Sequence, residues 1–83
     1  MKTIKNLGNK RTEVEFISFD DLKKWFHTKR NNELYANFRF RNTYHVNDVD
    51  DNFIYIHVVD TDAKKAVRIS YSEFKKAEQI FIR

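Results

Sequence analysis

The sequence predicts an α+β domain: an antiparallel β-meander of three to five strands with two helices packed on one face. Short stretches in which apolar and polar residues alternate recur along the chain, as they do in half-buried strands. Two other stretches place apolar residues at helical spacing. The later strand-like stretches are joined by short turns, which favours antiparallel pairing. We therefore expect the order β(β)-α-β-β-β-α in a single domain over residues 1–83.

The first regular strand is predicted at residues 12–17, where Val14 and Phe16 alternate with glutamates. Residues 1–7 are expected to pair with it across a turn at residues 8–11, which hold the single glycine of the chain. There is no proline, and eight asparagines mark most of the other breaks. Asparagine suits such positions because it tolerates the left-handed conformation better than most residues.

The first helix is predicted to begin at Ser18, whose hydroxyl can accept hydrogen bonds from the first helical amides. Acidic residues follow at once and suit the positive end of the helix dipole, while basic residues 29–30 suit its negative end. Asn31 and Asn32 are expected to close the helix. Its buried side is predicted from an apolar stripe, which consists of Phe19, Leu22, Trp25 and Phe26.

Three further strands are predicted at residues 34–44, 53–59 and 67–69, with loops at residues 47–52 and 60–65. The alternation in the first of these strands is the most regular in the chain.

A second helix is predicted to begin at Ser70, because Ser70 and Glu73 have the spacing of a capping box. Its apolar stripe consists of Phe74, Ala77, Ile80 and Phe81.

The alternation also predicts which side chains face the helices and which lie on the open face of the sheet. The inward set is Leu34, Ala36, Phe38, Phe40, Ile54, Ile56, Val58, Val67 and Ile69. The outward set is Tyr35, Asn37, Arg39, Arg41, Tyr55, His57 and Arg68. Arginine binds phosphates with paired donors, and rings stack on unpaired bases. We therefore predict a nucleic-acid-binding face; the alternatives are an ordinary solvated face and a protein contact.

The overall charge agrees with an anionic partner. Lysine and arginine total 16 against 12 acidic residues, which gives a net charge of +4, and the pI is about 9.4. RNA is favoured over duplex DNA, because no helix-turn-helix pattern is present and an open sheet suits unpaired bases. A basic patch on the first helix, formed by Lys23, Lys24, His27 and Arg30, is either its solvated side or a set of auxiliary phosphate contacts. If the patch binds phosphates, the expected contacts are Lys23, Lys24 and Arg30.

Several chemistries are excluded or disfavoured by composition. The chain has no cysteine, so disulfides, cysteine-based zinc sites and thiol nucleophiles are excluded. Residues 48–59 lack the glycine and the glutamate of a calcium-binding EF-hand loop, and no phosphate-cradling glycine loop occurs. We expect no cofactor and no catalysis. The one catalytic alternative is a small metal-free ribonuclease that uses His57 beside Arg39 and Arg41.

Assembly and location are predicted from what the chain exposes. Neither a signal peptide nor an apolar stretch of about 20 residues is present, so no membrane contact is expected and a cytoplasmic location is predicted. Trp25 and Phe53 are large for so small a core, and an unpaired strand edge can pair with a second copy. A homodimer is therefore one expectation.

Taken whole, the chain resembles the small early proteins of T-even-type lytic phages. It is short, rich in lysine, asparagine, phenylalanine, tyrosine and isoleucine, and nearly free of glycine and proline. The resemblance is one of composition and covers all 83 residues. It implies a host-takeover or counter-defence protein, for example an inhibitor of a toxin–antitoxin endoribonuclease. The alternative to RNA binding is a protein-binding inhibitor of such a host enzyme, without nucleic-acid affinity.

Overall fold

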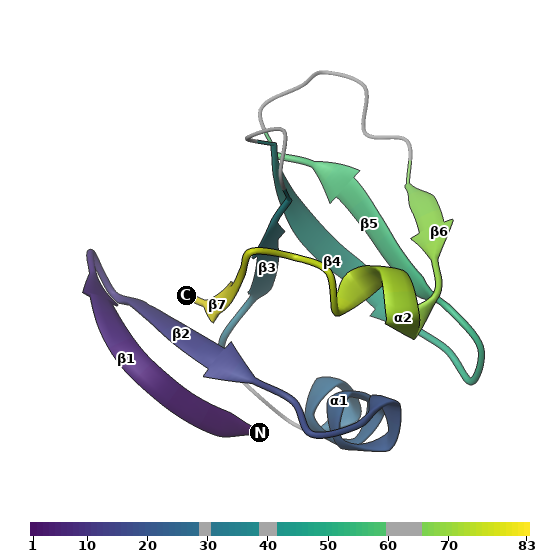
Figure 1. The fold of residues 1–83 in the computed structure, drawn as a ribbon, viewed down its shortest axis with the longest axis horizontal. Coiled ribbons are helices and arrows are strands. Elements are labelled where there is room, and N and C mark those ends of the chain that lie inside the picture. Colours follow the sequence, from purple (N-terminus) through teal and green to yellow (C-terminus); the bar gives the residue numbers. More distant parts are fainter. Residues whose placement is uncertain (29–30, 39–41, 60–65) are drawn as a thin grey trace.

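The computed structural model describes residues 1–28, 31–38, 42–59 and 66–83, and in these it shows one antiparallel sheet of seven strands and two helices. The elements are β1 (Lys2–Gly8), β2 (Arg11–Glu15), α1 (Phe19–His27), β3 (Leu34–Asn37), β4 (Thr43–Val49), β5 (Ile54–Val58), β6 (Val67–Ile69), α2 (Tyr71–Phe74) and β7 (Gln79–Ile82). The strand order is β1-β2-β7-β3-β4-β5-β6. Figure 1 shows the sheet bent around the helices, with β1 and β2 on one side and β4 to β6 on the other. The α+β class is confirmed.

The β1–β2 hairpin forms where the sequence predicts it. Gly8 pairs with Arg11, and the two residues between them, Asn9 and Lys10, both have positive φ, at 51° and 63°. Such a turn matches the right-handed twist of the flanking strands. Gly8 itself has a φ of 80°, which favours glycine.

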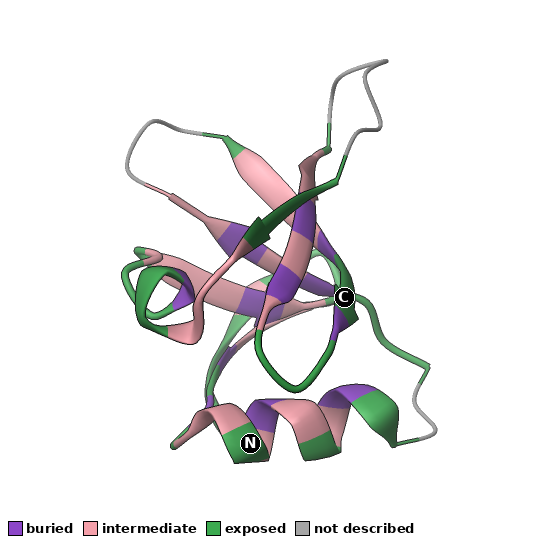
Figure 2. Ribbon diagram, turned by 90° about the vertical axis from the view of Figure 1, so that its right-hand side faces the viewer, coloured by how far each residue is buried: buried purple, intermediate pink, exposed green. Residues whose placement is uncertain are grey.

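Helix α1 begins at the predicted cap. The Ser18 hydroxyl accepts a hydrogen bond from the Asp21 amide at 3.1 Å, and Asp21 in turn forms an ion pair with the Met1 ammonium at 2.8 Å. Leu22 and Phe26 are buried, as the stripe predicts. Figure 2 shows the buried residues of α1 on the side that faces the strands. The helix ends at His27, earlier than the asparagines expected to close it.

The single strand predicted at residues 34–44 is wrong. The structure has two antiparallel strands there, and Asn37 pairs with Thr43, so the chain reverses between these residues. Apolar and other residues alternate in the sequence from Leu34 to Arg41, and such a pattern does not show where a strand turns back. Strand β4 then continues to Val49, into the predicted loop, with a bulge between Val46 and Asp48. Arg39, Phe40 and Arg41 lie outside the described residues.

The second predicted helix is wrong beyond its first turn. The Ser70 hydroxyl accepts from the Glu73 amide at 3.2 Å as predicted, but α2 ends at Phe74. Residues 79–82 form β7, which inserts between β2 and β3 and hydrogen-bonds to both. Both neighbours offer unpaired backbone groups, and the β-branched and aromatic residues of this segment favour a strand. The sheet is therefore not a meander, and its strand count exceeds the predicted three to five.

The core lies between the bent sheet and the two helices, and both helices contribute to it. Its buried members are Val14, Phe16, Leu22, Phe26, Leu34, Ala36, Val46, Val49, Ile54, Ile56 and Phe74. Most of the predicted inward set is buried or packed against this cluster. Val58 is only half-buried, Val67 is 56% exposed on the edge strand β6, and Phe40 lies outside the described residues. Among the described residues, no helix is long and apolar enough to cross a membrane.

Candidate functional site

The face of the sheet opposite the helices carries a continuous line of rings. Strand register places Phe81 beside Tyr35, Tyr35 beside His45, and His45 beside His57, over four adjacent strands. Each neighbouring pair of ring centroids is 5.2 Å apart, and the Tyr35 and Phe81 rings are stacked at 15°. We call Phe81, Tyr35, His45 and His57 the aromatic row.

Hydrogen bonds fix the two imidazole rings of the aromatic row. Nε2 of His45 lies 2.9 Å from a Glu33 carboxylate oxygen, and its Nδ1 lies 3.0 Å from the Asn47 side-chain oxygen. Nδ1 of His57 approaches the same Asn47 oxygen at 2.5 Å. Asn47 is the extra residue of the β4 bulge, so the bulge sets the position of the amide that holds both rings. The ring planes are therefore set before any ligand arrives.

The aromatic row has a closed end and an open end. Phe81 is only 5% exposed: its ring stacks on Tyr35, and the Arg11 guanidinium lies over it, 5.7 Å from the centroid. Tyr35, His45 and His57 are half-buried, so each presents part of its ring to solvent. A ligand can therefore reach part of each of these three side chains, while Phe81 stacks on one face of the Tyr35 ring.

Amide and hydroxyl groups lie along one side of the aromatic row. The Thr43 hydroxyl donates to the Asn37 side-chain oxygen at 2.7 Å, and the Gln79 amide donates to a Glu13 carboxylate oxygen at 3.3 Å. These groups offer the donors and acceptors that base edges require, next to ring surfaces that bases stack on.

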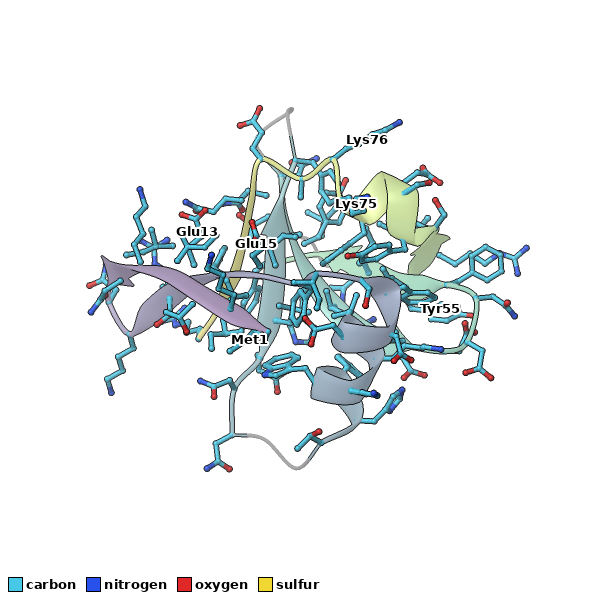
Figure 3. The ribbon with its side chains drawn as sticks, turned by 60° about the horizontal axis from the view of Figure 1, so that its bottom comes forward. Met1, Glu13, Glu15, Tyr55, Lys75 and Lys76 are labelled. Atoms are coloured by element: carbon cyan, nitrogen blue, oxygen red, sulfur yellow. The ribbon has the colours of Figure 1, made fainter. Side chains whose placement is uncertain are left out.

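Tyr55 and Arg68, predicted for the same site, lie on this face near the edge of the sheet. They pair across β5 and β6, and the Arg68 guanidinium lies over the Phe53 ring, 4.6 Å from its centroid. The Tyr55 hydroxyl donates to Asp50 at 2.6 Å. Figure 3 shows Tyr55 and Glu13, which belongs to β2, at opposite ends of the molecule. Arg68 and Tyr55 thus extend the face beyond His57.

The Tyr55–Asp50 contact predicts a pH dependence of stability. The Tyr55 hydroxyl lowers the pKa of Asp50 below its ordinary value of 3.8, and the amides of Asn52 and Phe53 lower it further. A depressed carboxyl pKa stabilises the fold above the unfolded-state value and loses that effect as the pH falls through the folded-state value. The stability difference between wild type and Asp50→Asn should therefore be larger at pH 6 than at pH 2.5 in urea titrations. An equal difference at both pH values would contradict it.

The lysines predicted on α1 do not join the aromatic row. Helix α1 packs on the inner face, whereas the row lies on the outer one. Lys23 is 3.7 Å from Asp51 and lies over the Phe19 ring, and Lys24 is 3.3 Å from Asp20. Both charges are thus partly neutralised within the chain. Arg30, like Arg39 and Arg41, lies outside the described residues.

Within the aromatic row and its hydrogen bonds, the sequence analysis missed Glu33, His45, Asn47 and Phe81. His45 and Asn47 fall just beyond the predicted strand end, and Phe81 was assigned to a helix. The available signal for Phe81 was β propensity, since an isoleucine lies on each side of it. Nothing in the sequence indicated the register that brings His45 beside His57.

No metal centre is built into the part of the chain that the structure describes, since no three histidine or carboxylate side chains converge there. No protein-family model matches this chain, and searches of curated proteins and of solved structures return no match.

Proposed function

We propose that this protein binds single-stranded nucleic acid, RNA in preference to duplex DNA, through the outer face of its sheet, without catalysing a reaction. The observation that carries the proposal is the aromatic row, in which neighbouring rings stand 5.2 Å apart with fixed planes and partly open surfaces. Stacking of a base on an aromatic side chain contributes about 1–3 kcal/mol and tolerates any base. A duplex hides its base surfaces, so it cannot use the row.

The same geometry supports binding over cleavage. A two-histidine ribonuclease holds its imidazoles on either side of a phosphate, where each nitrogen can move a proton. Here the Nδ1 atoms of His45 and His57 share one amide oxygen, and Nε2 of His45 is held by Glu33. Three of the four ring nitrogens are thus engaged within the protein, which suits a binding surface.

The physiological role that we propose is that of a small phage-encoded protein in the host cytoplasm, where it would inhibit or redirect an RNA-acting host or defence system. The supporting observations are the net charge of +4 and the composition of the chain. Arg39 and Arg41, which lie outside the described residues, remain proposed phosphate contacts.

One observation favours the alternative of a protein-binding inhibitor. Carboxylates border the aromatic row, with Glu13 opposite Phe81 and Glu33 against His45. They would repel phosphates, whereas tyrosine and arginine are frequent anchors of protein interfaces. The two functions differ in the steepness of their response to salt, because each phosphate that the protein neutralises on a nucleic-acid strand releases condensed counterions.

Fluorescence anisotropy with a labelled 12-nucleotide single-stranded RNA, and with the same RNA annealed to its complement, tests the proposal. We expect tighter binding of the single strand and a log–log salt slope of about −0.7 for each phosphate contact. No binding of either RNA would overturn the proposal. Recovery of a host protein that stays bound through nuclease treatment and high salt would then support the inhibitor.

A further inference from the structure

A hollow that adjoins the closed end of the aromatic row is lined entirely by polar and cationic residues. It lies where the β1–β2 turn meets the end of β7, and its lining is Asn9, Lys10, Arg11 and Arg83. Lys10 and Arg83 are exposed, and Arg11 is half-buried, with its guanidinium over the Phe81 ring. We call these three cationic residues together with Asn9 the cationic hollow.

The sheet register brings the cations of the hollow together. Thr12 pairs with Ile82 and Glu13 with Phe81, so the next position of this ladder places Arg11 opposite Arg83. Like charges at directly opposite positions destabilise a sheet. Lys10 has a positive φ and follows Asn9 in the hairpin turn, so the same turn adds a third cation beside this pair. An assembled cluster of this kind is most stable with an anion between its members.

The carboxylates of the described residues leave the hollow uncompensated. None of them forms an ion pair with Lys10, Arg11 or Arg83. Glu33 lies opposite Arg83 and exchanges two backbone hydrogen bonds with it at 3.0 Å, but its carboxylate is directed to His45. Even with the α-carboxylate of Arg83 counted, the hollow keeps a net positive charge.

Arg11 connects the hollow to the aromatic row. Its guanidinium lies over the Phe81 ring, and its Nε is covered by protein yet makes no hydrogen bond within the described part of the chain. A guanidinium held by stacking keeps its terminal N–H groups in a fixed fork, the arrangement that pairs with two phosphate oxygens.

We propose that the cationic hollow is a phosphate-binding subsite, which holds one or two phosphate groups of a nucleic-acid strand whose neighbouring bases stack on the aromatic row. The inference rests on the proposed function for the identity of the ligand, and on the hollow alone for its chemistry. Arg11 and Arg83 bind the phosphate oxygens, and Lys10 supplies a further charge from the turn.

The subsite can be tested without RNA. Inorganic pyrophosphate is titrated into ¹⁵N-labelled protein, and we expect saturable shifts of the amides of Lys10, Arg11 and Arg83. Arg11→Gln with Arg83→Gln should abolish saturation, and Arg83→Gln alone should weaken it. The matched control is Lys2→Gln with Lys76→Gln, which removes the same charge from two exposed residues; Figure 3 shows Lys76 pointing away from the ribbon. Shifts that do not saturate, or that the control variant reduces equally, would overturn the subsite.

The RNA titration separates this inference from the proposed function. Arg11→Gln with Arg83→Gln should make the log–log salt slope shallower by about 0.7 if the hollow holds one phosphate, and by about 1.4 if it holds two. Saturable pyrophosphate binding without RNA binding would leave the subsite standing and overturn the proposed function. If the double variant binds RNA with an unchanged salt slope and pyrophosphate does not saturate the protein, the subsite is overturned and the proposed function stands.

Discussion

Replacing Phe74 with alanine is expected to lower the free energy of unfolding by about 3–5 kcal/mol, the usual cost of deleting a fully buried phenyl ring. Phe74 is 0% exposed and is the only buried residue of α2. The helix has four residues, too few to persist without tertiary contacts. Small domains have a total stability of about 5–15 kcal/mol, so the variant should be partly unfolded at 37 °C. Urea denaturation followed by circular dichroism measures the loss.

Phe53→Ala is the matched control for this prediction, because it removes the same ring from a half-buried position on the outer face. This substitution removes the cation–π contact with Arg68 and a partly buried ring. It should lower the free energy of unfolding by less than half as much as Phe74→Ala does. Equal costs for the two variants would show that α2 does not anchor the core. A normal unfolding midpoint for Phe74→Ala would contradict the burial on which the prediction rests.

Phe74 also illustrates what the sequence predicts well. The Ser70 cap and the apolar residue four positions later follow local rules, and local rules were also sufficient for α1 and the β1–β2 hairpin. In each case the deciding interactions lie within one or two turns of chain. The inward positions of β3 and β5 were predicted for the same reason, since alternation alone decides which side of a strand is buried.

The errors concern long-range pairing. Residues 79–82 become a strand because β2 and β3, far apart in sequence from each other and from this segment, leave a gap that it fills. This pairing of residues 79–82 with β2 and β3 places Phe81 on the outer face and completes the aromatic row. The pairing of His45 with His57 depends on a reversal after Asn37 and on the β4 bulge, and neither has a periodic signature. Tyr35, Tyr55, His57 and Arg68 share the outer face as their alternation predicts, but the register that joins them to His45 and Phe81 was not predicted.

Removing the ring of Tyr35 is expected to give the largest loss of RNA affinity from a single substitution on the row. Tyr35 contacts two other members, Phe81 and His45, and is the most central ring with an open surface. Tyr35→Leu keeps an apolar side chain against Phe81 but cannot stack. A loss of about 1–3 kcal/mol of stacking corresponds to roughly 5- to 150-fold weaker binding. Tyr35→Phe keeps the ring and should bind within about twofold of wild type.

The salt dependence of these two variants gives the decisive comparison. Stacking is not a charge contact, so Tyr35→Leu should lower the affinity at every salt concentration and leave the log–log slope unchanged. A shallower slope would mean that the substitution had displaced phosphate contacts and that the row acts only as a scaffold. Undiminished affinity in a folded Tyr35→Leu protein would exclude the aromatic row as the stacking surface. Weakening by Tyr35→Leu with rescue by Tyr35→Phe is the result that ring stacking requires, because only the ring distinguishes the two side chains at this position.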